Sequence, residues 1–189
     1  MKLETKRLIL RKPKMSDWKD VLEGVGEYDV AKMLLKIPHP YYKKDAEEFI
    51  KKTIKRWRKK VKDDYLFLIE LKFEKKVIGA IGLHNVDDFS KIATTGSWIN
   101  KKYWRVGYMT EAKIAVNDFA FNELKLRRLN SYVFANNKAS NGTQLKMGYK
   151  LEGKKRKAVK SKVTGEIYDE NIYGLLKEDW VKTRKKLVK

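Results

Sequence analysis

Just past its midpoint the chain reads Tyr103-Trp104-Arg105-Val106-Gly107-Tyr108-Met109-Thr110-Glu111-Ala112. These residues follow an apolar segment typical of a strand, and they begin a segment in which apolar residues recur at helical spacing. The first N–H groups of a helix lack intrahelical acceptors, and the helix dipole adds partial positive charge there. Gly107 lets a ligand approach the backbone closely. The segment therefore predicts a binding site for a diphosphate group, with an ordinary strand-to-helix turn as the alternative.

This segment differs from the two commonest phosphate-binding loops. No Gly-Lys-Ser or Gly-Lys-Thr follows it, so it is not a Walker A loop. Its turn holds a single glycine, which excludes the dinucleotide-binding fingerprint with its three glycines. Neither motif therefore identifies the fold, which must be predicted from the order of the strands and helices around the segment.

The apolar and turn residues on either side predict alternating strands and helices. Strands are predicted over 7–11, 65–71, 77–83, 92–99, 128–134, 149–160 and 166–176, and helices from about residue 18 and over 45–61, 107–124 and 139–147. Three strands joined by short turns are antiparallel neighbours, whereas the strand–helix–strand unit over 92–134 needs a parallel crossover. These connections predict a single-domain α/β fold over 1–176, with a mixed sheet of about seven strands flanked by about four helices. A basic tail over 177–189 is expected to fray.

Composition excludes several classes of protein. The chain has 189 residues, no cysteine and two histidines, His39 and His84. Disulfides, zinc–thiolate sites and thiol nucleophiles are therefore excluded, and we expect no metal site. No apolar run reaches the roughly 18 residues of a membrane helix, and the N-terminus does not resemble a signal peptide. We expect a cytoplasmic protein with no membrane contact.

The net charge of +21 is unusual for a chain of this size. Such an excess of lysine and arginine favours anionic partners such as nucleic acid, ribosomes or phosphorylated ligands, and it disfavours a polycationic substrate. Lysine-rich surfaces are also typical of thermophiles or of organisms with a biased composition. The charge alone does not distinguish these interpretations.

The segment over 104–109 resembles the acetyl-CoA pyrophosphate loop of the GNAT N-acetyltransferases, [QR]-x-x-G-x-[GA]. Trp104, Gly107 and Met109 stand at its first, fourth and sixth positions. The longer pattern Tyr-Trp-x-x-Gly-Tyr-Met-Thr-Glu-Ala is similar to the variant in ribosomal-protein N-terminal (Rim-type) acetyltransferases. Further similar motifs occur in the family's order over roughly 3–176, namely 7–11, 78–83, Asn137-Lys138-Ala139-Ser140, 148–153, and Asp169 with Tyr173.

The resemblance implies an enzyme in which a neutral amine attacks the thioester of the cosubstrate acetyl-CoA, an oxyanion forms and the CoA thiolate leaves. It implies that the backbone over 105–110 holds the pyrophosphate, that 98–100 pairs with the pantetheine arm, and that the Ile99 amide polarises the thioester carbonyl. The cofactor-binding residues implied are Trp98, Ile99, Asn100, Arg105, Val106, Gly107, Tyr108, Met109, Thr110, Asn137 and Ser140.

The catalytic residues predicted are Ile99 and Ser140, with Ser140 relaying a proton to the thiolate, and Glu152 as a candidate base. Some Rim-type enzymes carry a glutamate in the strand after Leu-Glu-Gly, but the stretch 157–160 holds no acid here. Glu111 and His84 therefore remain as alternative bases, and a water chain is another. Each candidate also has a structural interpretation: Glu152 pairing with nearby lysines, Glu111 complementing the helix dipole, and His84 ending a strand.

Further side chains have open roles. Asn137 and Ser140 suit helix capping without any ligand. Tyr108 and Tyr149 either donate a proton to the thiolate or pack against helix and sheet. Tyr41 and Tyr42, in a proline-rich loop, are candidates for contact with the acceptor.

The acceptor that the resemblance favours is a protein N-terminal amine, as in ribosomal proteins. The alternatives are a small amine such as a polyamine or an antibiotic, or a non-enzymatic RNA-binding domain, although no helix-turn-helix, zinc-finger or RNP pattern is present. A basic run on the last predicted hairpin either contacts rRNA or is a solvated face, and it comprises Lys150, Lys154, Lys155, Arg156, Lys157, Lys160 and Lys162. We expect a monomer or a homodimer.

Overall fold

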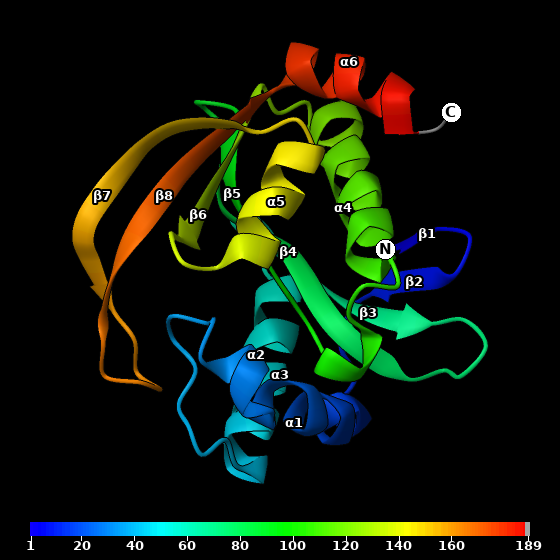
Figure 1. The fold of residues 1–189 in the computed structure, drawn as a ribbon. Coiled ribbons are helices and arrows are strands. Elements are labelled where there is room, and N and C mark those ends of the chain that lie inside the picture. Colours follow the sequence, from blue (N-terminus) through cyan, green and yellow to red (C-terminus); the bar gives the residue numbers. More distant parts are fainter. Residues whose placement is uncertain (188–189) are drawn as a thin grey trace.

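The computed structural model describes residues 1–187. Within these residues eight strands form one mixed sheet in the order β1-β2-β3-β4-β5-β6-β8-β7 (Figure 1). The strands are β1 (Lys2–Glu4), β2 (Leu8–Arg11), β3 (Asp64–Leu71), β4 (Val77–Asp87), β5 (Ile92–Ile99), β6 (Arg128–Phe134), β7 (Lys150–Lys160) and β8 (Ile167–Leu176). The helices are α1 (Trp18–Gly26), α2 (Tyr28–Ala31), α3 (Lys43–Trp57), α4 (Tyr108–Asp118), α5 (Lys138–Lys146) and α6 (Lys177–Leu187).

The single α/β domain with a mixed sheet is confirmed, and so is the parallel crossover. Strands β5 and β6 pair in parallel, whereas the other neighbours in the sheet pair antiparallel. The sheet has more strands than predicted because β1, only three residues long, forms a hairpin with β2 that is too short to show an apolar alternation. Helices α2 and α6 add to the predicted number, and α3 ends at Trp57, earlier than predicted.

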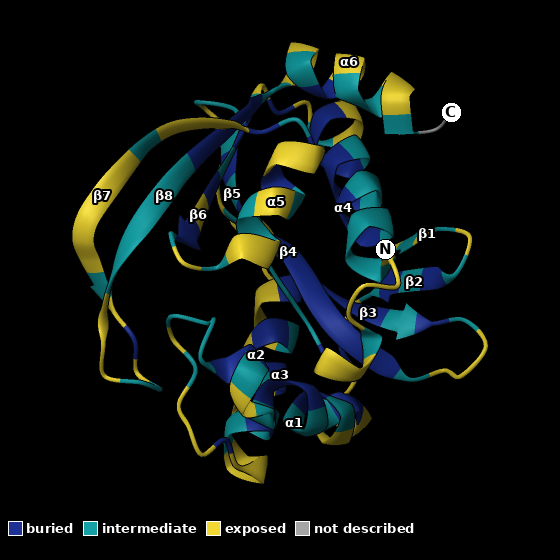
Figure 2. Ribbon diagram, viewed as in Figure 1, coloured by how far each residue is buried: buried dark blue, intermediate teal, exposed yellow. Residues whose placement is uncertain are grey.

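Helices cover both faces of the sheet. Leu66 and Leu68 of β3 pack with α1 and α3 on one face, while Phe67 and Ile69 belong to the cluster that includes α4 on the other. Figure 2 shows the resulting buried centre of the sheet. Because β3 is buried on both faces, its sequence is a nearly unbroken apolar run.

The ladder between β5 and β6 stops before either strand ends. It joins Ile92–Thr95 to Arg128–Ser131, yet β5 continues to Ile99 and β6 to Phe134. We call the space between the ends of these two strands the β5–β6 gap. The Asn100 N–H donates to the Ile78 carbonyl of β4, so strand alternation turns the N–H groups of Ser97 and Ile99 toward the gap.

The segment expected to fray is helix α6, so that expectation is wrong for 177–187. Trp180 is 2% exposed and its indole N–H donates to Asp118 Oδ1 at 2.9 Å, while Arg184 Nε donates to Asp118 Oδ2 at 2.9 Å. Asp118 closes α4, so α6 packs on the end of that helix. Residues 188–189 of the predicted tail lie outside the described residues.

Strand β7 is the last strand of the sheet and pairs only with β8. Nearly all of its residues are exposed, as Figure 2 shows along the outer ribbon. The basic run of the sequence lies on this edge strand and the turn after it. None of the helices over 1–187 has the length and apolarity needed to cross a bilayer.

Candidate active site

The loop before α4 has the geometry of an anion cradle. Gly107 caps the helix at φ 86° and Arg105 has φ 62°, so the chain turns sharply on both sides of Val106. Within residues 1–187, the first N–H here with an intrahelical acceptor is that of Glu111, which donates to the Gly107 carbonyl at 3.1 Å. Within the described residues, the N–H groups over 105–110 therefore have no intrahelical acceptor and are available to a ligand.

Space at Gly107 is open. A Cβ built on this glycine would have Nη2 of Arg7 as its nearest neighbour, at 3.6 Å. The loop backbone is therefore accessible to a ligand. The residues present suit a diphosphate, and the assignment of 105–110 to cofactor binding stays a prediction.

An ion pair far apart in sequence anchors the start of α4. Glu111 Oε1 accepts from the Arg7 N–H at 2.8 Å and from Thr5 Oγ1 at 2.5 Å, and Oε2 accepts from Arg7 Nε at 2.7 Å. Nη1 of Arg7 donates to the Val106 carbonyl at 3.1 Å. Burial opposes ionisation of this carboxyl, but the hydrogen bonds from Thr5 and Arg7 outweigh it and lower the pKa of Glu111. Glu111 is thus an anchor of the loop.

We expect Glu111→Gln to destabilise the protein at neutral pH by about 1–2 kcal/mol, because it removes a charge-assisted pair that is only partly screened. A carboxyl with a lowered pKa stabilises the fold above its unfolded pKa and loses this effect as the pH falls through its folded pKa. The melting temperature should therefore fall by a few degrees at pH 7 and by less below the usual glutamate pKa of 4.5. Thermal melts across pH, with the exposed Glu123→Gln as control, test this, and a pH-independent difference would contradict it.

The three residues predicted to hold the pantetheine arm point in different directions. Trp98 packs against α1, where a Cβ on Gly24 would lie 2.6 Å from its ring. Asn100 is buried, and its side-chain oxygen accepts from the Lys102 N–H at 3.0 Å. Only Ile99 turns its N–H toward the β5–β6 gap, and its carbonyl accepts from the Trp104 indole at 2.9 Å. The structure therefore brings Ile99, but neither Trp98 nor Asn100, to the gap.

Ser97 was missed by the sequence reasoning. Its N–H faces the gap like that of Ile99, two residues further along β5. The period-two rule applied to 92–99 would have found it. The N–H groups of Ser97 and Ile99 lie beyond the end of the β5–β6 ladder at Thr95, and two such groups on one strand suit an extended arm added to the sheet.

The start of α5 is built as a cap. Asn137 Oδ1 accepts from the Ser140 N–H at 3.0 Å, so the capping role is present. Asn141, which was not singled out from sequence, ties this helix to the end of β6: its side-chain N–H group donates to the Phe134 carbonyl at 3.0 Å, and its Oδ1 accepts from the Tyr173 hydroxyl at 2.7 Å. Cofactor contact by Asn137 and Ser140 stays a prediction.

Glu152 lies on exposed β7 and both of its carboxylate oxygens accept from Arg128, one of them at 2.8 Å. The hydrogen bonds from Arg128 lower the pKa of Glu152, which weakens it as a base. Arg128 begins β6, and the gap opens at the other end of that strand. The structure thus pairs Glu152 with an arginine, rather than the lysines considered above, and its catalytic role stays untested.

Three tyrosines have packing roles. Tyr149 is buried with its hydroxyl 3.2 Å from Thr95 Oγ1, and burial raises its pKa. The guanidinium of Arg7 lies 4.3 Å from the centre of the Tyr108 ring. Tyr41 belongs to the core cluster of α1 and α3, and its contact with an acceptor stays a prediction. Its proline-rich loop folds this ring inward, whereas the neighbouring Tyr42 is exposed.

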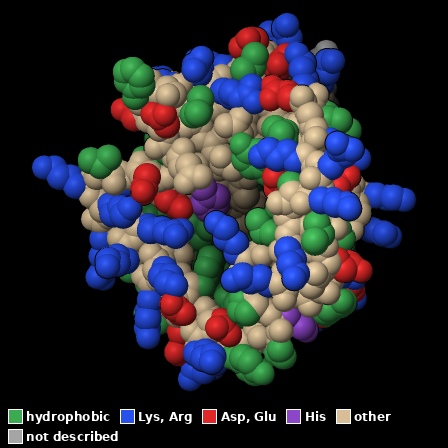
Figure 3. Space-filling view, turned by 90° about the vertical axis from the view of Figure 1, so that its left-hand side faces the viewer, with side chains coloured by type: hydrophobic (Ala, Val, Ile, Leu, Met, Phe, Trp, Pro, Cys, Tyr) green, Lys and Arg blue, Asp and Glu red, His purple; other side chains and the backbone are tan. Residues whose placement is uncertain are grey.

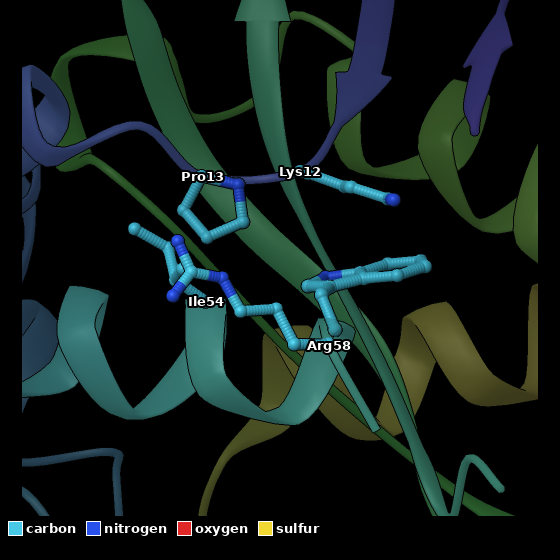
Figure 4. A pocket seen from close by; sticks show the side chains of 5 residues that line it. Lys12, Pro13, Ile54 and Arg58 are labelled. Atoms are coloured by element: carbon cyan, nitrogen blue, oxygen red, sulfur yellow. The ribbon is translucent and has the colours of Figure 1, made fainter. Parts of the chain in front are cut away.

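Two surface pockets lie at opposite ends of α3. One, of about 610 Å³, is lined by Tyr42, Lys43, Lys44 and Glu47. The other, of about 190 Å³, is shown in Figure 4 and is lined by Lys12, Pro13, Ile54, Trp57 and Arg58. Neither is lined by a residue of the loop over 105–110 or of β5, so neither belongs to the candidate site.

Comparison with known proteins identifies the family. Residues 7–150 match the acetyltransferase (GNAT) domain. The chain is 31% identical over 180 residues to the uncharacterized N-acetyltransferase YoaA of Bacillus subtilis, covering 93% of this chain and 96% of the relative. It is 30% identical over 135 residues to "Putative ribosomal N-acetyltransferase YdaF" of the same organism, covering 71% and 73%. A GNAT-family acetyltransferase structure from Bacillus anthracis is 28% identical, with TM-score 0.79 and coverage of 94% and 99%.

The chain therefore belongs to the GNAT family of acetyltransferases. It is an acetyl-CoA-dependent N-acetyltransferase. This result excludes the alternative of a non-enzymatic RNA-binding domain. Acetyl-CoA supplies the activated acyl thioester. In the described part of the chain, the N–H groups over 105–110 and those of Ser97 and Ile99 have no backbone partner, which fits its diphosphate and its extended arm.

Proposed function

We propose that this enzyme acetylates the N-terminal amine of a polypeptide, with ribosomal proteins as the substrate class. The observation that carries the proposal is the similarity to YdaF, whose name describes a ribosomal N-acetyltransferase. The net charge of +21 supports it, because a strongly basic enzyme is attracted to rRNA-rich particles. We place the enzyme in the cytoplasm, as a monomer or a homodimer.

In the proposed reaction, the backbone over 105–110 binds the diphosphate and Arg105 adds a fixed positive charge. The N–H of Ile99 donates to the oxygen of the reacting carbonyl, where negative charge develops as the amine attacks. Ser140, at the start of α5, passes a proton to the leaving sulfur. The amine must enter uncharged, because only the neutral form carries a free electron pair.

The basic run on β7 is proposed to contact rRNA. Its members lie on an exposed edge strand that curves away from the domain and, for Lys162, in the turn after it. Figure 3 shows the molecule from this side, with lysine and arginine side chains spread around a hollow in whose wall a histidine lies. Contacts of this kind orient an enzyme on a particle without reading sequence.

Mass spectrometry after incubation with acetyl-CoA tests the substrate class. The acceptors are peptides with different free N-terminal residues, intact ribosomes, spermidine and an aminoglycoside. We expect acetylation at peptide and ribosomal-protein N-termini, with the ribosome reaction weakening as salt rises. Acetylation of the small amines alone would contradict the proposal.

A further inference from the structure

A bare patch of sheet lies beside the candidate site. Gly82 of β4 and Gly96 of β5 are directly opposite each other in the antiparallel register, so this rung carries no side chain. His84 is two residues after Gly82 and lies on the same face. A Cβ on Gly82 would be 3.2 Å from His84 Cε1, and a Cβ on Gly96 would be 3.2 Å from His84 Nε2. The imidazole therefore lies over the glycine pair, with Nε2 toward β5.

A largely buried carboxylate orients this ring. Asp64 of β3 stands opposite His84 in the register, and its Oδ2 is 2.9 Å from His84 Nδ1. The same oxygen accepts from Arg56 Nη1 at 3.0 Å, and the Asp64 side chain is only 12% exposed. Within residues 1–187, Asp64 Oδ1 is buried without a hydrogen-bond partner.

This arrangement sets the tautomer of the ring. A proton on Nδ1 is shared with Asp64, which leaves Nε2 with a free electron pair. The charged group that contacts His84 is Asp64 from β3, and Arg56 from α3 contacts Asp64 in turn. The residue opposite His84 on β5 is the uncharged Thr94. The His84 side chain is 29% exposed, from which we infer that Nε2 can reach a proton donor from outside.

The patch adjoins the β5–β6 gap. Gly96 directly precedes Ser97, whose N–H faces the gap, and Ile99 follows on the same strand. Because Gly96 carries no side chain, no side chain of β5 lies between the His84 imidazole and the edge of β5 that faces the gap at this pair of residues. An amine lying on the glycine pair is then beside both Nε2 and the position proposed for the reacting carbonyl.

We propose that His84 accepts the proton of the acceptor amine and that Asp64 is its positioning residue. This proposal rests on the proposed function. The amine nitrogen bonds to the acyl carbon, Nε2 takes one N–H proton, and the C–S bond breaks with its electron pair going to sulfur. The thiolate takes up a proton to give free CoA, and the imidazolium returns its proton to solvent.

The test compares His84→Ala and His84→Gln in two reactions: acetylation of the peptide that the wild type uses fastest, and slow hydrolysis of acetyl-CoA, in which water replaces the amine. We expect kcat to fall about 100-fold or more in both variants, the usual effect of losing a proton acceptor. The acetyl-CoA thermal shift should be unchanged. Added imidazole should restore turnover in His84→Ala, where it enters the vacated space, but not in His84→Gln.

Asp64→Asn should lower kcat by about 10-fold while leaving the KM for acetyl-CoA unchanged. The matched control is Asp63→Asn, because Asp63 is the adjacent carboxylate, 59% exposed and paired with Lys59 at 3.0 Å rather than with His84. That control should retain wild-type turnover. Equal losses in both aspartate variants would overturn the positioning role.

The outcomes separate this proposal from the proposed function. Wild-type rates in His84→Ala would overturn the role of His84 alone, as would a loss that accompanies a lowered melting temperature and resists imidazole. If no peptide is acetylated but imidazole-dependent hydrolysis appears in His84→Ala, the role of His84 stands and the acceptor class is wrong. A wild type that shows neither reaction overturns both.

Discussion

Replacing Gly107 by glutamate is expected to abolish acetyl-CoA binding while the free protein stays folded. The added carboxylate would stand among the N–H groups that we propose bind the diphosphate. Like charges about 4 Å apart repel by about 4 kcal/mol at an effective dielectric constant of 20, roughly a thousandfold in affinity. The fold should tolerate the change, because the nearest neighbour of a Cβ at Gly107 is 3.6 Å away and the left-handed backbone costs about 1–2 kcal/mol.

Calorimetric titration with acetyl-CoA measures this loss, and Gly165→Glu is the matched control. Gly165 also has a positive φ, 72° against 86° for Gly107, with open space around it, but it lies in the β7–β8 turn. The control carries the same backbone penalty and should bind acetyl-CoA normally. Unchanged affinity in Gly107→Glu would show that the diphosphate lies elsewhere.

Truncating Trp180 to alanine should produce the largest loss of stability among the single changes considered. The side chain is 2% exposed and its indole N–H is bonded to Asp118, so the change leaves a cavity and an unpaired acceptor. Removal of a buried tryptophan costs about 3–5 kcal/mol, which lowers the melting temperature of a chain of this length by about 10 °C or more.

Thermal melts of Trp180→Ala and of Val181→Ala check this expectation. Val181 is the next residue of α6 and is 46% exposed, so its truncation should change the melting temperature by a degree or two at most. Similar melting temperatures for Trp180→Ala and the wild type would mean that α6 adds little to the domain.

Much of the fold could be predicted from local pattern. The nearly unbroken apolar run of β3 reflects burial on both faces, and Gly107 marks the start of α4 because the chain needs a positive φ there. The parallel pairing of β5 with β6 follows from the intervening helix alone. Residues 105–110 and Ile99 were predicted as site residues for a similar reason, since they lie where a strand ends and a helix begins.

What escaped prediction depends on partners distant in sequence. Glu111 has the sequence position of a residue that complements a helix dipole, but its partner is Arg7, which directly precedes β2 and lies 104 residues earlier in the chain. Helix α6 buries one side chain fully, Trp180, and most of its other residues are charged, so its segment resembles a charged tail. The contact of Asp64 with His84 depends on the register of β3 and β4, which places the two residues opposite each other. No rule of sequence spacing connects them.

The exposed edge strand β7 affects how copies of the protein associate with one another. An edge strand has a row of backbone N–H and C=O groups without partners in its own sheet. A strand of another chain can pair with them, which is the first step of edge-to-edge aggregation. Lysine and arginine side chains at Lys154, Lys155, Arg156 and Lys157 would bring like charges face to face in such a joint. The cations that we propose to contact rRNA would thus also oppose pairing between copies of the enzyme, and a bound polyanion would cover the strand whose charge it neutralises.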